Sequence, residues 1–379
     1  MHDFLLKELS NTDIEKELEI IGFDKSYRHK AKDKFTYKNF KIFDLTVAQA
    51  NIIKQTALSV GADCATHREV ITGKIDKSSC ILGGSLSQLE KIAQKLKAQP
   101  FGLKTLGEII QEKIQHFPPK KTQIMGILNL TPDSFSDGGK FIELNDAIDH
   151  LNQLIKDGAD IIDIGAESTK PYSTGVDAKT QLEKLEPVLK YIQENNINTT
   201  ISIDTRSAEV AEKCIKLGAN IINDVSGLEH DNLMAETIAK YPNIKVIIQH
   251  SKGSPATMQD NPEYNNLIDE IYFSLKNKID YALSKGIKKE NIIIDAGIGF
   301  GKTKEHNLEI IKRWKEFTTL DCPVLLGLSR KSLLGMPDAT NEEKDIYTLA
   351  LNSILINENI DYIRVHNVKI HKQFQNILN

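Results

Sequence analysis

From Ile124 to its C-terminus, the chain repeats one pattern: a short apolar run, a polar or glycine-rich turn, and a longer amphipathic segment. This alternation indicates strands and helices that follow one another in a parallel sheet. We predict strands at Ile124–Leu130, Asp160–Ile164, Thr200–Asp204, Asn220–Asn223, Lys245–His250, Ile292–Asp295, Val324–Gly327 and Tyr362–Val365. Eight such units in about 250 residues predict a closed (β/α)8 TIM barrel of the α/β class. The alternative is an open doubly wound sheet.

The segments between the predicted strands carry apolar residues at three- and four-residue spacing, which is typical of amphipathic helices. The clearest of these predicted helices are Asp177–Gln193, Ala208–Lys216, Leu267–Ser284, Asn307–Glu316 and Glu342–Asn357.

The first part of the chain has a different character, with lysine-rich segments and fewer regular repeats. Here we predict helices at Asp13–Ile21, Val47–Val60 and Leu86–Lys97, and a strand at Ser79–Leu82. These elements indicate a small additional α+β domain over residues 1–120, followed by the barrel over 121–379. The two prolines in Phe117–Lys121 would end the preceding helix and stiffen the connection between the two domains.

Gly83-Gly84-Ser85 lies between a predicted strand and a predicted helix, and it allows two interpretations. Backbone amides in such a turn can hold a phosphate. The more usual role is a tight connection in which Ser85 caps the helix. The other glycine and lysine positions of a P-loop are absent, which favours the second interpretation.

Composition excludes several classes of function. No apolar run approaches the roughly 20 residues needed to span a bilayer, and Met1–Glu8 has no features of a signal peptide, so we expect a cytoplasmic protein. Four widely spaced cysteines, at positions 64, 80, 214 and 322, argue against a zinc site or a disulfide framework. A net charge of −4 with interspersed signs gives no basic stripe for nucleic acid.

Polar residues gather directly after the predicted strands. In a (β/α)8 barrel, this edge is where active sites lie. They are Asn129, Glu167-Ser168-Thr169-Lys170, Asp204-Thr205-Arg206, Asn223-Asp224, His250, Asp295, Ser329-Arg330-Lys331-Ser332, Arg364 and His366. Each has a purely structural alternative: the aspartates as helix caps, Ser329–Ser332 as a capped helix start, and His366 as a satisfied histidine on a surface helix. Their coincidence at one rim favours an active site.

Several motifs in this region resemble the dihydropteroate synthase family of folate biosynthesis. They are Asn129–Gly139, Glu167-Ser168-Thr169, Ile221–Asp224, Gly299-Phe300-Gly301-Lys302, Ser329–Ser332 and Arg364-Val365-His366. The resemblance covers roughly two thirds of the chain and includes the ends of all the predicted strands. It implies a transferase that condenses 6-hydroxymethyl-7,8-dihydropterin diphosphate with 4-aminobenzoate, assisted by Mg2+, and that forms no covalent enzyme intermediate.

The resemblance also implies roles for individual residues. Asp295 would accept the paired donors of the pterin, as a carboxylate accepts a guanidinium, and Asp204 and Asn223 would contact the same edge. Lys331 would lie at the pterin carbonyl near the second substrate. Phe300 would flank the aromatic acid, and Ser332 would bind its carboxylate; Phe300 is alternatively a core residue.

The resemblance also implies a diphosphate site. It would consist of Asn129, as the metal ligand, together with Arg364 and His366. These six residues (Asn129, Asp204, Asp295, Lys331, Arg364 and His366) are the catalytic candidates. Two loops at the mouth would close over the diphosphate. The first follows Asn129 and contains the lid segment Ser134–Gly139. The second contains Thr169, Lys170 and Pro171.

The chain also departs from the family pattern. Lys170 stands where arginine is usual, which gives a point charge in place of a planar fork. Gln249–Gly253 replaces a methionine-rich segment, so direct contact of His250 with the substrate is only one of the alternatives. Ala296 stands where proline is usual. The N-terminal domain resembles nothing we know; dimerisation, docking and packing remain open. We expect small-molecule substrates and a homodimer. The alternative functions are a pterin-binding methyltransferase-like barrel and an inactive pterin-binding subunit.

Overall fold

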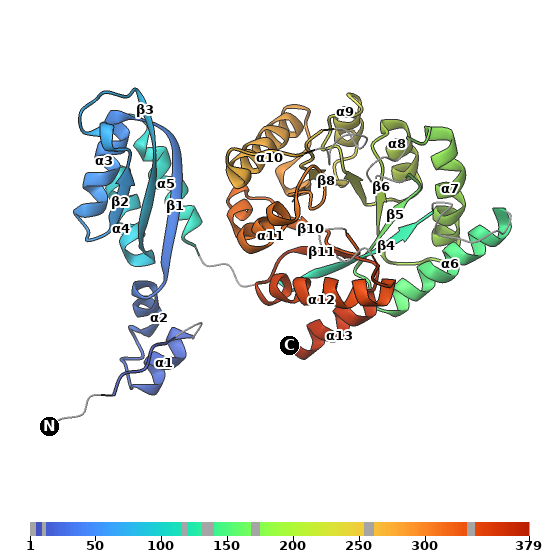
Figure 1. Cartoon of the computed structure of the whole chain (residues 1–379), viewed down its shortest axis with the longest axis horizontal. Coiled ribbons are helices and arrows are strands. Elements are labelled where there is room, and N and C mark those ends of the chain that lie inside the picture. Colours follow the sequence, from blue (N-terminus) through green and yellow to red (C-terminus); the bar gives the residue numbers. More distant parts are fainter. Residues whose placement is uncertain are drawn as a thin grey trace. The chain divides into compact units, whose positions relative to one another are not determined.

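The computed structural model describes residues 5–9, 13–115, 120–130, 140–167, 175–253, 261–331 and 338–378 (Figure 1). The chain divides into two compact units, residues 1–118 and 119–379. Each unit has its own core of buried apolar side chains. We therefore describe each unit by itself.

The first unit is built on a three-stranded antiparallel sheet in the order β1-β3-β2. Its strands are β1 (Tyr37–Thr46), β2 (Asp63–Thr66) and β3 (Lys77–Ser85), and its helices are α1 (Ile14–Ile20), α2 (Arg28–Ala31), α3 (Val47–Leu58), α4 (Leu86–Leu96) and α5 (Leu103–Lys113), with 3-10 turns at Lys32–Lys34 and Arg68–Val70. Its core includes Ile53, Leu82 and Leu89, which are fully buried.

The turn interpretation of Gly83-Gly84 was wrong, because both glycines lie inside β3 and pair with Asn39 and Lys38 of β1. The interpretation of Ser85 is confirmed: its hydroxyl accepts from the backbone N–H of Gln88, and the Gln88 side chain accepts from the backbone N–H of Ser85. This reciprocal capping box starts α4 directly at the end of the strand.

The second unit is a closed barrel of eight parallel strands in the order β10-β11-β4-β5-β6-β7-β8-β9, surrounded by helices (Figure 1). The barrel prediction is confirmed, and the open doubly wound sheet is wrong. The strands are β4 (Gln123–Asn129), β5 (Ile161–Gly165), β6 (Thr200–Asp204), β7 (Ile221–Asp224), β8 (Lys245–Gln249), β9 (Ile292–Asp295), β10 (Val324–Leu326) and β11 (Tyr362–Val365).

The helices follow the strands along the chain. They are α6 (Lys140–Lys156), α7 (Ala178–Glu194), α8 (Ala208–Lys216), α9 (Met234–Ala239), α10 (Leu267–Ser284), α11 (Lys304–Arg313), α12 (Asn341–Asn357) and α13 (Val368–Leu378), with 3-10 turns at Lys289–Asn291 and Trp314–Leu320. Helix α11 starts earlier than we predicted because Thr303 and His306 form a capping box. It ends at Arg313, where the chain tightens into a 3-10 turn.

Two apolar layers stabilise the barrel. The larger one lies between strands and helices and includes Leu128, Ile203 and Phe317. The smaller one fills the barrel interior and consists of Met125, Ile161, Ile221, Ile247, Ile293, Leu325 and Tyr362. These interior residues come early in their strands, so the amino-terminal part of the barrel is a packed apolar plug. On five of the strands the next inward position is polar, which places the chemistry at the carboxyl end; these residues are Asp163, Asn223, Gln249, Asp295 and Arg364.

Candidate active site

The parallel register aligns the predicted site residues around the carboxyl end of the barrel, which we call the mouth. Asn129 of β4 pairs with Gly165 of β5, Gly165 pairs with Asp204 of β6, and Asp204 pairs with Asn223 of β7. A Cβ atom at Gly165 would lie 3.3 Å from the Asp204 Cβ and 3.7 Å from Asn129 Oδ1. A side chain at this position would therefore crowd the predicted pterin carboxylate and the predicted metal ligand, and glycine avoids that contact.

Arg364, at the end of β11, bridges two carboxylates across the mouth. Its Nε donates to Asp163 Oδ2 at 2.6 Å, and its Nη2 donates to Asp204 Oδ2 at 2.9 Å. Asp163 is fully buried, and the Asn223 Nδ2 also donates to its Oδ2, at 3.1 Å. This network connects the predicted residues Arg364, Asp204 and Asn223. Asp163, at its centre, was not among the predicted site residues.

The two carboxylates of this network each retain an oxygen that is not paired. Among the described residues, Asp163 Oδ1 and Asp204 Oδ1 are buried without a hydrogen-bond partner, as is the Ser202 hydroxyl of the same interior. Buried polar atoms of folded proteins almost always have partners. Two acceptors without partners at one mouth are what a ligand with donor groups would satisfy.

Burial and the charges of this network shift the pKa values of its members. Burial raises the pKa of Asp204 to about 7; Arg364 opposes this rise, and Asp163 adds to it. Burial alone would lower the pKa of Arg364, but Asp163 and Asp204 raise it above its usual value. Arg364 is therefore a permanent cation, whereas Asp204 changes protonation near neutral pH.

Asp295, at the end of β9, is buried and has one oxygen bound to the backbone. Its Oδ1 accepts from the Gly297 N–H at 2.7 Å. Burial raises its pKa, and Lys331 opposes that rise. This carboxylate retains its second oxygen for a further donor.

Lys331 follows β10 and lies against Phe300, with its Nζ 4.7 Å from the centre of the ring. The same Nζ donates to the carbonyl of Ile298. Burial lowers the pKa of Lys331 to about 8, while Asp295 raises it and Arg364 lowers it further. The structure thus places Asp295, Phe300 and Lys331 together on one side of the mouth.

His250, after β8, is held by Lys302, a residue to which we had assigned no role. Lys302 Nζ lies 2.9 Å from His250 Nδ1 and donates to the Phe300 carbonyl at 3.0 Å. Burial lowers the pKa of His250 to about 2 and holds the pKa of Lys302 well below its usual range. Because Lys302 occupies Nδ1, the histidine orients the Phe300 loop, and only its Nε2 remains to contact a ligand.

His366, directly after β11, is fixed by Ser329. The Ser329 Oγ accepts from the His366 backbone N–H at 3.1 Å and lies 2.8 Å from its Nδ1. The serine hydroxyl therefore occupies Nδ1, which leaves Nε2 as the ring nitrogen available to a ligand. Burial lowers the pKa of His366 to about 3, with Arg330 and Arg364 adding to the effect. His366 is a neutral imidazole, and the surface-helix alternative was wrong because the residue is not in a helix.

Three other rim residues have structural partners. Asp224 accepts from the N–H groups of Ser226 and Leu228, so it fixes the loop after β7. Helix α8 is capped by Ser207, so the cap interpretation of Asp204 was wrong. Glu167 pairs with Arg206, and both line a cavity of about 640 Å³ beside the mouth.

Some predicted residues lie outside the described part of the chain. They are Thr169, Lys170, Pro171, Ser332 and the lid segment Ser134–Gly139. Within the described ranges, no group of three or more histidine, cysteine, aspartate or glutamate side chains could hold a metal. None of the helices described has the length and apolar character of a membrane span.

Comparison with known proteins gives a consistent result. The family model described as "Pterin binding enzyme" matches residues 125–366. Dihydropteroate synthase of Clostridium beijerinckii is 44% identical over 251 residues, which is 66% of this chain and 90% of that protein. The crystal structure of dihydropteroate synthase from Clostridium difficile, determined in the presence of pteroic acid, superposes with a TM-score of 0.64 at 40% identity and covers 69% of this chain and 97% of that one.

A further relative extends over the N-terminal unit. The bifunctional dihydropteroate synthase/dihydropteroate reductase of Helicobacter pylori is 33% identical over 370 residues. The match covers 97% of this chain and 96% of that protein. The N-terminal unit is therefore part of the similarity, which the sequence alone had not indicated.

Proposed function

Because the chain belongs to the dihydropteroate synthase family of pterin-binding enzymes, we propose that its barrel mouth condenses 6-hydroxymethyl-7,8-dihydropterin diphosphate with 4-aminobenzoate. The products are 7,8-dihydropteroate and diphosphate, a step of tetrahydrofolate biosynthesis. The observation that carries the proposal is Arg364, a partly buried cation bound between Asp163 and Asp204 at the mouth of this barrel. A methyltransferase-like barrel would need no such site for a departing anion.

The pterin binds to the carboxylates of the mouth. Asp295 accepts the amino group and ring N–H of the pterin with its free oxygen, and Asp204 and Asn223 contact the same edge. The unpaired Oδ1 atoms of Asp163 and Asp204 support this assignment, since they require donors that the described residues do not supply.

The reaction exchanges one bond for another. The aniline nitrogen of 4-aminobenzoate attacks the CH2 carbon, the carbon–oxygen bond breaks, and diphosphate leaves with the bonding electrons. The nitrogen then loses a proton. Arg364 stabilises the departing anion through its charge, and His366 donates an uncharged N–H. The amine is already a nucleophile, so the step requires no covalent enzyme intermediate.

Mg2+ fits the donor set of this mouth. Asn129 offers a single amide oxygen at the end of β4, next to Gly165, which carries no side chain. Mg2+ is commonly held by one or two protein oxygens, with phosphate oxygens and water completing its shell. Asn129 would therefore hold the ion, which supplies positive charge to the diphosphate.

The second substrate binds on the Lys331 side. Phe300 flanks the aromatic ring, and Ser332 binds the carboxylate. Thr169, Lys170 and Pro171 contribute to a loop over the diphosphate, where the lysine contacts the anion as a point charge. We further propose a cytoplasmic homodimer, for which the oligomeric state in solution is the direct test.

The central test is release of diphosphate by the purified full-length protein with both substrates and Mg2+. We expect release that depends on each substrate and on the metal. Absence of release when all three are present would contradict the proposed function.

A second test isolates the pterin site. Asp295→Ala removes the predicted acceptor of the pterin's paired donors, so pterin binding measured by calorimetry should fall below detection. Asp224→Ala is the control, because Asp224 bonds to its own loop. Equal pterin affinity in the Asp295 variant and the wild type would contradict the assignment.

The Helicobacter pylori relative favours a second candidate function, because its match includes the N-terminal unit. We propose that the chain also reduces dihydropteroate. A two-electron donor, such as a reduced nicotinamide or flavin, would supply hydride to carbon 6 of the C=N bond, and nitrogen 5 would take a proton from water. Formation of tetrahydropteroate from dihydropteroate by the full-length chain would support this activity, and no such product with either class of reductant would contradict it.

A further inference from the structure

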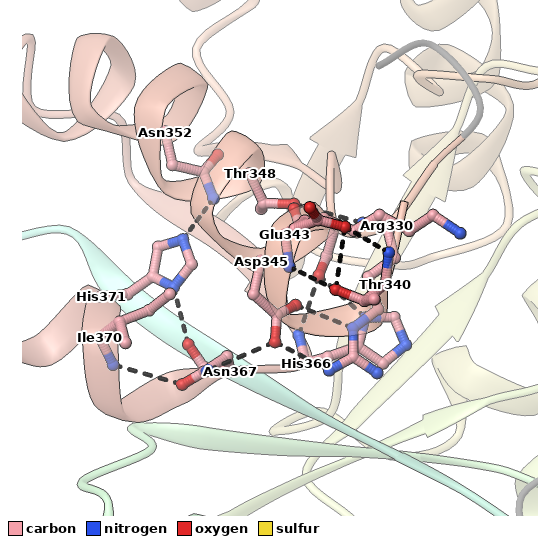
Figure 2. Close-up of polar contacts among 12 residues, drawn as sticks. Arg330, Thr340, Glu343, Asp345, Thr348, Asn352, His366, Asn367, Ile370 and His371 are labelled. Carbon is pink, nitrogen blue, oxygen red and sulfur yellow. Dashed lines mark hydrogen bonds and ion pairs between the residues drawn. The ribbon is translucent and has the colours of Figure 1, made fainter. Parts of the chain in front are cut away.

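Arg330 and Asp345 form a partly buried ion pair beside the mouth that the mechanism does not use. Arg330 Nε donates to Asp345 Oδ1 at 2.8 Å, and Arg330 Nη2 donates to Asp345 Oδ2 at 2.8 Å (Figure 2). Arg330 lies in the loop after β10, and Asp345 lies on α12 with 4% of its surface exposed. Paired contacts of this kind fix the plane of the guanidinium as well as its position.

The backbone of Arg330 is in an unusual conformation. Its φ is 57°, in the left-handed region that side chains other than glycine seldom adopt. Such a conformation is strained and persists only where the surroundings enforce it. Here the paired contacts with Asp345 are joined by a bond from the Arg330 N–H to the Thr348 hydroxyl at 3.3 Å. Helix α12 therefore holds both the side chain and the backbone of residue 330.

The two neighbours of Arg330 both act at the mouth. Ser329 fixes the ring of His366, and Lys331 reaches the Phe300 ring and the Ile298 carbonyl. A left-handed residue between them reverses the chain locally. The conformation of residue 330 thus sets where two site residues lie.

Asp345 also holds the loop that follows β11. Asn367 Nδ2 donates to Asp345 Oδ2 at 3.3 Å, and Asn367 is the residue after His366. The Asn367 carbonyl in turn accepts from His371 Nδ1 at 2.7 Å, which leaves the His371 Nε2 to accept from Asn352 at 2.9 Å (Figure 2). One carboxylate on α12 therefore connects the loops that carry Lys331 and His366.

We infer that Asp345 is a positioning residue for the proposed condensation: through Arg330 and Asn367 it sets the geometry of Ser329, Lys331 and His366. The inference rests on the proposed function for its kinetic consequence. It concerns the side of the mouth built by β10 and β11. The pterin carboxylates stand on β5, β6 and β9 and have their own partners.

The test is Asp345→Asn in the full-length protein. The amide keeps the shape of the carboxylate but replaces one acceptor of Arg330 with a donor. We expect kcat to fall about 100-fold, the size of effect that a misplacement of about 1 Å produces. Affinity for a pterin without phosphates should fall far less than kcat, since the pterin carboxylates are untouched and only the Lys331 contact at the carbonyl is displaced.

Two further variants separate positioning from simple stability. Asp345→Glu keeps both acceptor oxygens and should recover most of the lost kcat. Asp160→Asn removes a carboxylate that binds Lys372 and the Ile124 N–H at the opposite end of the barrel. This control should lower the melting temperature without lowering kcat. If Asp345→Asn does not fold, Arg330→Lys replaces it, since lysine cannot contact both oxygens in the same plane.

A spectroscopic measurement makes the test independent of activity. In the wild type, the nitrogen NMR signals of His366 should show a single tautomer, because the Ser329 hydroxyl holds Nδ1 in one hydrogen bond. Asp345→Asn should give a mixture of tautomers, whereas Asp160→Asn should not. An unchanged tautomer together with wild-type kcat in Asp345→Asn would overturn the inference. Failure of the wild type to release diphosphate would contradict the proposed function alone.

Discussion

Carboxylates occur at both ends of the same barrel, and the two ends use them differently. At the amino-terminal ends of the strands, Asp160 accepts from the Ile124 N–H at 2.7 Å, and Asp361 accepts from the Val324 N–H at 2.9 Å. At the mouth, Asp163 and Asp204 share Arg364, and each has one oxygen without a partner among the described residues. The first pair contributes to stability, whereas the second is arranged for a ligand at a cost in stability.

The largest expected effect is at the mouth. Arg364→Ala should lower kcat/KM for the pterin diphosphate about 1000-fold, because it removes the partly buried cation that is proposed to face the departing anion. Affinity for a pterin without phosphates should fall far less. Steady-state kinetics and calorimetry measure the two quantities. Equal losses in both would contradict the assignment of Arg364 to the diphosphate.

The second effect is a dependence of stability on pH. Asp204 has a pKa of about 7 in the folded protein, against an ordinary value of 3.8. Between these values, the folded protein binds a proton that the unfolded chain has released. The contribution of Asp204 to the free energy of unfolding is therefore fully present below about pH 4. It decreases as the pH rises through about 7, and the total loss is up to about 4 kcal/mol. Urea unfolding of the wild type and of Asp204→Asn from pH 4 to 8 measures it; parallel profiles would contradict it.

The third effect is at the apolar plug. Ile247→Ala should lower the free energy of unfolding by about 3 kcal/mol, because it leaves a cavity in a packed interior. The KM values should not change, since no plug residue reaches the mouth network. Ile354→Ala on α12 is a matched control, because 48% of the Ile354 surface is exposed. A loss of activity without a loss of stability in Ile247→Ala would contradict the division between the two ends.

The smallest effect is at the amino-terminal carboxylates. Asp160→Asn should cost about 1 kcal/mol of unfolding free energy, the net value of a single hydrogen bond. Activity should remain at the wild-type level. A fall in kcat comparable to that of the mouth variants would show that the two ends are coupled.

The barrel could be predicted because its information is local and repeated. Each strand is an apolar run between turns, and the parallel register then brings residues such as Asp204, Asn223 and Arg364 to one rim. Strand boundaries were displaced by only a residue or two, as in β5 and β7.

Asp163 was missed because it lies inside an apolar strand and not after one. The signal was present nonetheless. A charged residue in the run Ile161-Ile162-Asp163-Ile164 cannot be buried without a partner, so it predicts a buried cation elsewhere in the barrel. That cation is Arg364, 201 residues away in the sequence.

The roles of Lys302 and Asp345 could not be predicted from sequence. Both depend on which helix and loop pack together, and the spacing of residues does not encode that. In the N-terminal unit, β1 was missed because its lysines conceal an alternating strand: Phe40 and Ile42 face the core while Lys41 faces away.

The apolar plug determines where substrates enter the barrel and where products leave it. A barrel packed at one end with side chains such as Ile247 and Tyr362 offers no exit there, so both substrates and both products share the mouth. Diphosphate must leave by the route through which the aromatic acid arrives. Accumulated product therefore obstructs entry as well as competing for the site, and the rate at which the mouth empties sets an upper limit on turnover.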